Sequence, residues 1–353
     1  MLNIAAALAG VFLIVVALRD VFQAVVVPRA MNRRLRVSAV ATSALWKLWP
    51  ALAYRFYRKE DAREDFFAVF APFSMIALLV TWVAMLIVGY GLLFYSIRLH
   101  LRPQPITFGT AVYYAGSSLL TIGYGDIVAR TGLGRLVSLA AGASGLGVVA
   151  VVTSYLFAVF GAFRQREAFV VMTGSRAGIP PSGIGLLEMH ATGEMRADLP
   201  LVFRDGQRWA ADVMESHLAY PVLGFFRSSH DYESWVATLG TMLDASVLMM
   251  STVDDTPAGQ ARIMYNVGGH CARDLAKYYG LNAEASVGID RLEFETACDR
   301  LVKSGFALRN RDQAWIEFAR LRSSYAAQLN ALARSLEIPP VQWVGDRSII
   351  HAH

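Results

Sequence analysis

Three long runs of apolar residues dominate the first half of the chain and predict membrane-spanning helices. They cover residues 2–27, 66–97 and 136–163. A helix needs about 20 residues, each rising about 1.5 Å, to cross the hydrocarbon core of a bilayer. The second and third runs contain no charged residue, while the first carries only Arg19 and Asp20 near its end. Such a pair can reach the membrane surface or find partners inside a helix bundle.

A fourth apolar stretch, residues 37–57, differs because it contains a lysine and a proline. If it spanned the membrane, the basic cluster at 33–36 would lie outside, against the tendency of Lys and Arg to remain in cytoplasmic loops. We therefore predict a helix lying in the membrane interface, with a fourth span as the alternative. Trp46 and Trp49 suit the level of the lipid headgroups.

The basic residues between positions 29 and 63 also predict the orientation of the chain. They place this segment in the cytoplasm, next to anionic lipid headgroups, and the N-terminus outside. The second half of the chain is then cytoplasmic. The first apolar run follows no basic segment and has no convincing cleavage site, which predicts a retained helix rather than a signal peptide. The expected location is the bacterial inner (plasma) membrane, crossed several times.

Beyond residue 163 the charges become regular and apolar residues recur every three or four positions, which is typical of helices in water. Residues 173–185, with two prolines and several glycines, predict a connector. Asn310 with Gln313 predicts a capping box, and Thr256 before Pro257 predicts another helix start. The predicted helices cover residues 206–219, 231–251, 257–279, 289–308 and 311–336. The chain thus divides into residues 1–65, 66–165 and 166–353.

Composition agrees with a membrane protein and argues against several other classes. The mean hydropathy is +0.39 and only 17% of residues are charged, outside the usual range of soluble domains. The net charge of +5 comes largely from the basic segment beside the apolar runs, so nucleic acid is not an expected partner. The two cysteines, Cys271 and Cys298, indicate no disulfide framework and are predicted to be inert, buried thiols.

The string Thr121-Ile122-Gly123-Tyr124-Gly125-Asp126 carries the candidate chemistry. A dehydrated potassium ion must be surrounded by oxygens that replace its water shell, and rings of backbone carbonyls do this. Successive carbonyls point the same way only where some residues take positive φ, which glycine does readily. The string follows a short apolar segment, 108–120, and lies between two predicted spans, where irregular backbone is tolerated inside protein.

With these features, residues 66–163 resemble the pore module of the potassium channel superfamily: outer helix, pore helix, filter and inner helix. The whole chain is similar to bacterial proteins described as ion channel family members. The resemblance implies K⁺ sites at the carbonyls of Thr121, Ile122, Gly123 and Tyr124, with Gly125 completing the filter. It implies support of the filter by Tyr113, Tyr114 and Asp126. Ser117 stands where some relatives have a carboxylate, so an acidic pair with Asp126 is not expected.

In the inner helix the resemblance places a gating hinge at Gly145, while close helix packing through a small residue is the alternative. Val149, Thr153 and Phe157 recur every four residues and, with Leu146, are the predicted lining of a central cavity. Phe157 is either a hydrophobic constriction or a residue packed against lipid or the outer helix. The predicted fold is an all-α membrane protein with this pore, an extra N-terminal transmembrane helix and a mostly α-helical cytosolic domain.

The predicted function is a potassium-selective channel subunit that works as a homotetramer, with K⁺ as permeant ion and no cofactor. The cytosolic domain is expected to gate it, in response to a ligand that the sequence does not identify. The alternative is a receptor or scaffold that keeps the pore fold without conducting. An enzyme is not expected, because the second and third spans have no charged residue, and no His or Cys spacing indicates a metal site. A single arginine in the first span does not make a voltage sensor.

Overall fold

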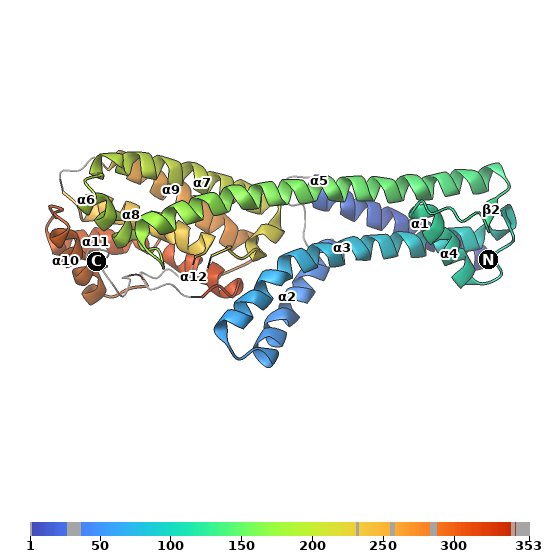
Figure 1. Ribbon diagram of the computed structural model, residues 1–353, viewed down its shortest axis with the longest axis horizontal. Coiled ribbons are helices and arrows are strands. Elements are labelled where there is room, and N and C mark those ends of the chain that lie inside the picture. The colour runs from blue at the N-terminus through green and yellow to red at the C-terminus, as the bar shows by residue number, and fades with distance from the viewer. Residues whose placement is uncertain are drawn as a thin grey trace. The chain divides into compact units, whose positions relative to one another are not determined.

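The computed structural model describes residues 2–26, 37–230, 233–254, 258–282, 288–339 and 343. These residues form two compact units, Met1–Phe160 and Gly161–His353, each described here by itself (Figure 1). Their boundary falls inside one continuous helix, α5 (Gly132–Ala177). The division at residues 65 and 165 expected from the sequence stays a prediction.

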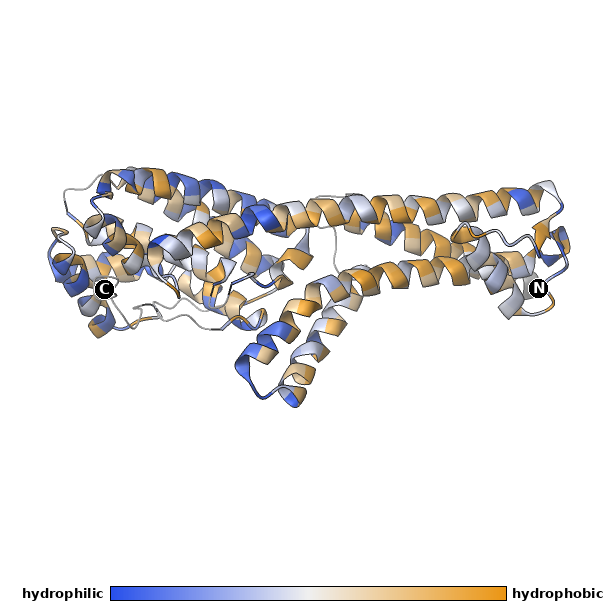
Figure 2. Ribbon diagram, in the orientation of Figure 1, coloured by the Kyte–Doolittle hydropathy of each residue, from blue (hydrophilic) through white to orange (hydrophobic). Residues whose placement is uncertain are grey.

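The first unit is built from long apolar helices. In chain order its elements are α1 (Leu2–Val21), the π-helical turn η1 (Phe22–Val26), α2 (Val37–Phe56), α3 (Glu60–Ser96), η3 (Arg98–His100), β1 (Leu101–Arg102), α4 (Phe108–Leu119), β2 (Val128–Ala129) and the first part of α5. Three of the described helices are long and apolar enough to cross a membrane: residues 4–25, α3 and α5. Figure 2 shows the predominance of apolar residues along them. The three predicted spans are thus helices, and α3 and α5 extend past the apolar runs.

Helices α1 and α3 approach closely because glycines face each other. A Cβ on Gly10 would lie 2.6 Å from the carbonyl oxygen of Gly89, and a Cβ on Gly89 would lie 3.1 Å from that of Gly10. Small residues allow backbones to approach in this way, which is a common source of helix association in membranes. Helix α1, the predicted extra N-terminal helix, is therefore packed against α3.

The buried carboxylate of Asp20 joins three helices. It accepts hydrogen bonds from the indole Nε1 of Trp82 on α3 at 2.7 Å, and from the backbone N and side-chain hydroxyl of Ser38 on α2 at 3.0 and 3.2 Å. Asp20 is only 4% exposed. A carboxylate is tolerated at such a depth only with several donors, so the predicted partnering of Asp20 within the bundle is found.

Helix α2 packs against the beginning of α3 through aromatic rings. Trp49 stacks on Phe66 at a centroid distance of 4.5 Å and donates a hydrogen bond to the Phe66 carbonyl at 3.1 Å. Trp46 meets Phe70 edge to face at 4.7 Å. Trp49 is buried here, so this tryptophan serves helix packing in addition to any role at lipid headgroups. The basic residues at 29–36 lie outside the described residues.

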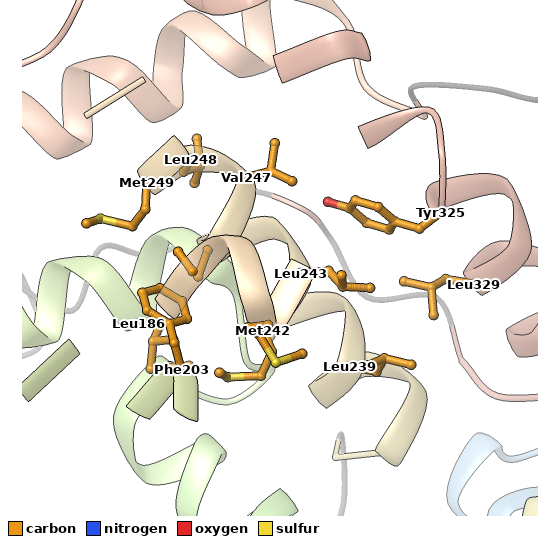
Figure 3. Packing of buried hydrophobic residues seen from close by; sticks show 14 of the residues in the cluster. Leu186, Phe203, Leu239, Met242, Leu243, Val247, Leu248, Met249, Tyr325 and Leu329 are labelled. Carbon is orange, nitrogen blue, oxygen red and sulfur yellow. The ribbon is translucent and has the colours of Figure 1, made fainter. Parts of the chain in front are cut away.

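The second unit is helical. Its elements are the end of α5, α6 (Gly183–Thr192), η4 (Arg196–Asp198), α7 (Leu199–Ala219), η5 (Pro221–Phe225), α8 (Trp235–Ser251), α9 (Gly259–Tyr278), α10 (Arg291–Lys303), α11 (Arg311–Arg322) and α12 (Ala326–Ser335). Helix α8 is buried along almost its whole length, and α6, α9, α11 and α12 pack around it. Figure 3 shows Leu186, Phe203 and Leu329 gathered about α8. This core explains why α8 has no polar face.

Several boundaries differ from those predicted. Residues 173–185 are not one connector, because α5 continues to Ala177 and α6 begins at Gly183. The helix predicted at 311–336 is two helices, with Ser323 and Tyr325 between them. Asn310 caps α11 by accepting from the backbone N of Gln313 at 3.2 Å, while the reciprocal capping box occurs at Asp290 and Glu293.

Two other predicted helices begin or end at different residues. The one at 206–219 begins earlier, at Leu199, and the one at 289–308 ends at Lys303, before Gly305 with a φ of +88°. The start predicted at residues 256 and 257, and residue 231, lie outside the described residues.

Candidate ion-conduction site

The short helix α4 is fixed between its neighbours by caps and close contacts. Thr107 caps it, its hydroxyl accepting from the backbone N of Thr110 at 3.2 Å. On the α3 side, Gly91 makes room for Val112, since a Cβ on Gly91 would lie 2.8 Å from a Val112 methyl group. The predicted short apolar segment before the glycine-containing string is therefore a helix whose position against α3 is fixed by packing.

The backbone after α4 is tied to the last turn of that helix. The carbonyl oxygen of Ser117 accepts from the backbone N of Ile122 at 2.9 Å and of Gly123 at 3.3 Å, and that of Ser118 accepts from Thr121 at 3.2 Å. The N–H groups at the start of the string are thus satisfied behind it. A strand held in this way can present its carbonyls on its other side.

Two of the positions expected to need glycine have positive φ. The φ angles are +61° at Gly123 and +81° at Gly125, and Thr121 also has a positive φ of +55°. An ideal Cβ on either glycine would meet no atom of the chain within 4 Å. Glycine is therefore required at these positions by backbone conformation rather than by space.

Aromatic support of the string comes from one of the two predicted tyrosines. Tyr113 stacks on Tyr124, with ring centroids 6.1 Å apart and planes within 6°, and its hydroxyl lies near the Asp126 carboxylate. Tyr114 instead meets Phe94 at 4.7 Å and shares a 2.8 Å hydrogen bond with Ser138. Within this chain Tyr113 braces the string, whereas Tyr114 holds α4 between the helices on either side.

A two-stranded ribbon closes the other end of the string. Strand β1 pairs with β2 in antiparallel register, with Arg102 opposite Val128, and the backbone N of Arg130 donates to the His100 carbonyl at 3.0 Å. His100 Nδ1 also lies 2.8 Å from the Thr131 hydroxyl. This ribbon was not predicted from the sequence, because strands of two residues leave no periodic pattern.

The predicted hinge residue, Gly145, is packed under the end of α4. A Cβ on Gly145 would lie 1.9 Å from the Leu119 carbonyl oxygen, a distance that no pair of non-bonded atoms occupies. The packing role offered as the alternative for Gly145 is therefore present, and the hinge role stays a prediction. Val148 and Val152 continue the buried side of α5.

The opposite side of α5 carries the predicted cavity residues. Leu146 is 66% exposed, Val149 52% and Phe157 77%, and the hydroxyl of Thr153 donates to the Val149 carbonyl of its own helix at 2.8 Å. These four side chains share one exposed face of the helix in the single chain. The constriction and packing alternatives for Phe157 both stay predictions.

Comparison with known proteins bears on this arrangement. A family model described as an ion channel matches residues 78–162. A Rhodopseudomonas palustris protein named "Putative potassium channel protein RPA4233" is 38% identical over 80 residues, which are 22% of this chain and 19% of that protein. These two matches support a pore module of the potassium channel superfamily at residues 78–162. The pore module includes the end of α3, all of α4, the string and most of the apolar part of α5.

A second relative extends past the pore module. The "Uncharacterized membrane protein YdjJ" of Bacillus subtilis is 22% identical over 178 residues, or 49% of this chain and 51% of that protein. The chain therefore spans about half the length of this relative and about a fifth of the Rhodopseudomonas protein. No solved structure matches the chain. The chain is a membrane protein with an ion channel domain.

Proposed function

We propose that this chain is a subunit of a potassium-selective channel, with residues 121–125 as the filter. The observation that carries the proposal is the backbone of the string. Its first N–H groups bond to Ser117 and Ser118 behind it, and positive φ at Gly123 and Gly125 turns successive peptide groups. In this proposal the carbonyls of Thr121, Ile122, Gly123 and Tyr124 bind dehydrated K⁺.

Four copies of the chain would make one pore. One chain contributes one strand of carbonyls, and an ion that has lost its water needs oxygens on all sides. The exposed side chains of Ile122 and Tyr124, 49% and 66% accessible, and the apolar face of α5 offer surfaces for neighbouring copies. Leu146, Val149, Thr153 and Phe157 would then line the entrance on the inner side, with Phe157 as a constriction.

We further propose that the protein lies in a bacterial inner membrane, with the N-terminus outside and with the second unit and the segment between α1 and α3 in the cytoplasm. Arg55 and Arg63 lie on either side of the turn between α2 and α3. Their guanidinium carbons are 5.8 Å from the ring centre of Phe56 and 5.1 Å from that of Tyr54, respectively. Such cations can meet anionic headgroups while their stems stay on apolar surface. Labelling of a cysteine at position 59, in the turn of the hairpin, from the cytoplasmic side alone is the expected result. Labelling from outside contradicts it.

Gating by the second unit is the remaining element of the proposal. Helix α5 is continuous from the pore module into this unit, and Arg166 fixes it there. The guanidinium is 2% exposed and donates to the carbonyls of Leu223 and Phe226 at 2.8 and 3.0 Å. A rearrangement of η5 would therefore act on the helix that carries the proposed cavity residues.

Two further contacts strengthen this anchor. Arg166 Nη1 lies 3.3 Å from His217 Nε2, and the indole of Trp209 donates to the Arg166 carbonyl at 3.1 Å. Because a guanidinium cannot accept, Nε2 is the acceptor, and the Nδ1–H of His217 donates to the Val213 carbonyl at 2.8 Å. Burial, followed by the nearby Arg166 charge, lowers the pKa of His217 well below 6.5 and keeps it neutral.

The second candidate function is a receptor or scaffold that keeps the pore fold without conducting. Purified protein in liposomes distinguishes the two. We expect a potassium gradient to drive flux and a matched sodium gradient to drive much less, with native mass measurements giving four chains. Absence of flux from a protein that forms the tetramer favours the receptor, and a dimer as the largest species contradicts the pore itself.

A further inference from the structure

A cavity in the second unit lies between α8, α12 and the beginning of α6. Its volume is about 510 Å³. Apolar side chains of both helices form much of its wall, among them Val236 and Ala237 of α8 and Leu329 and Ala333 of α12. Cavities of this size, mostly apolar with a few polar groups, are the usual sites of small molecules.

Among the described residues, Asp244 is the one carboxylate that lines the cavity, and its charge is balanced by Arg322. Asp244 accepts from Arg322 Nε at 3.0 Å and from the Tyr325 hydroxyl at 2.5 Å. Tyr325 is fully buried, and burial followed by the Asp244 charge raises its pKa well above 10, so it stays a donor. This triad occupies the cavity floor without offering negative charge to a ligand.

A buried hydrogen-bond donor also lines the cavity. Trp343 is 9% exposed, and its Nε1 has no hydrogen-bond partner among the described residues. The ring is held by Arg322, whose guanidinium lies 5.6 Å from its centre, and by Phe318 at 5.5 Å. A buried indole N–H without an acceptor costs free energy. An acceptor atom on a bound ligand would remove that cost.

Polar side chains lie at the rim of the cavity, and one of them is positively charged. Arg334 and the neutral Asn330 are exposed, line the cavity, and are four residues apart on one face of α12. The N-terminal turns of α6 and α8, capped by Ser182 and Ser234, also reach the cavity and carry partial positive charge. Donors of α6, α8 and α12 therefore border one cavity, together with a buried indole N–H that has no acceptor among the described residues.

We propose that this cavity binds a small organic anion, with a carboxylate or phosphate toward Arg334 and Asn330 and an apolar or aromatic body against Leu329. The indole N–H of Trp343 supplies a hydrogen bond to an acceptor on the ligand. This site goes beyond the proposed function, because binding can be measured whether or not the protein conducts.

The test uses the full chain in detergent and three ring compounds of one shape. These are 2-naphthyl phosphate, 2-naphthoate and the neutral 2-naphthol, titrated by calorimetry against detergent blanks. We expect saturable binding of at least one anion, one per chain, and at least about tenfold weaker binding of naphthol. The tighter of the two anions identifies the class of head group. Equal binding of all three compounds, or no saturable binding of either anion up to about 10 mM, overturns the proposal.

Variants separate this cavity from other basic surfaces. Arg334→Gln and Trp343→Phe are each expected to weaken anion binding about tenfold, a loss typical of one charged or buried hydrogen bond. Arg320→Gln is the matched control, since Arg320 is exposed on α11 and paired with Glu317 outside the cavity. Arg334 is exposed, so its variant tests the site even if Trp343→Phe unfolds. Unchanged binding in Arg334→Gln overturns the assignment.

Discussion

Gly145 of α5 lies against the carbonyl oxygen of Leu119 so closely that a methyl group at position 145 would be 1.9 Å from it. The two residues come from the inner helix and from the last turn of α4, just before the proposed filter. Gly147, two residues later, would place a methyl group within 4 Å of no other group. These two glycines of one helix therefore have opposite constraints.

This difference predicts opposite effects of alanine. Within a helix, alanine is favoured over glycine by about 1 kcal/mol, so Gly147→Ala should keep or raise the thermal unfolding temperature of the purified protein. Gly145→Ala should lower it, because α4 or α5 must move to relieve the contact. Potassium flux should fall in Gly145→Ala alone. If both variants are equally stable, the helices separate readily at this point, which favours the hinge.

Alanine substitutions of the glycines in the proposed filter should impair function for a different reason. Alanine at position 123 or 125 meets no atom but must adopt positive φ, at a cost of about 1 to 2 kcal/mol in each copy. We expect Gly125→Ala to lose preference for potassium over sodium in flux assays while the assembly persists. D-alanine, introduced by semisynthesis, prefers positive φ and should restore the preference. Unchanged selectivity with L-alanine would show that this loop is not the filter.

The neutral state of His217 predicts an acid-sensitive second unit. Its pKa is lowered in the folded chain, so below about 6.5 the unfolded chain binds a proton that the folded chain does not. The stabilising contribution of neutral His217 is complete above about 6.5. It falls by up to about 1.4 kcal/mol per pH unit below that value.

Urea unfolding at a series of pH values measures this slope. His217→Gln should be less stable at neutral pH but should lose part of the pH dependence between about 6.5 and 5. His270→Gln is the control, because His270 is exposed and paired with Asp274 on its own helix. A full pH dependence in His217→Gln would assign the acid sensitivity to other groups.

Breaking the buried ion pair of Glu188 and Arg300 should lower the free energy of unfolding more than breaking an exposed ion pair of the same type. Glu188 is fully buried and accepts from Arg300 Nε at 2.8 Å, joining α6 to α10. Glu188→Ala removes the carboxylate that pairs with this guanidinium and should cost about 3 to 5 kcal/mol of unfolding free energy. Glu317→Ala breaks the exposed pair with Arg320 and should cost about 0 to 1 kcal/mol. Equal losses would mean that water reaches Arg300.

The fold was predictable where long patterns dictate it and unpredictable where single contacts decide. The charges after Phe163 marked the end of an apolar run, but polarity does not end a helix, and α5 continues to Ala177. Helix α6 was missed because Gly183 and Gly185 are usually signs of a loop. Here they permit contact, since a Cβ on Gly183 would lie 2.6 Å from the backbone N of Ala245.

The candidate site shows the same division. The positive φ of Gly123 and Gly125 followed from the motif, because the chemistry needs that conformation. The different neighbours of Tyr113 and Tyr114 did not, because adjacent residues of a helix point about 100° apart and only packing decides what each meets. The partners of Asp20 could not be predicted from the sequence either, since Trp82 is 62 residues away along the chain.

The bond pattern at Ser117 has a consequence for how this region can change during evolution. The string is tied to α4 through the main-chain carbonyl of Ser117, so its attachment does not depend on which side chain residue 117 carries. Ser117 is 7% exposed, so the size of the side chain at this position is limited. Homologues can therefore exchange a hydroxyl for another small group at this position and change the surroundings of the string without breaking the hydrogen bonds that attach it to α4.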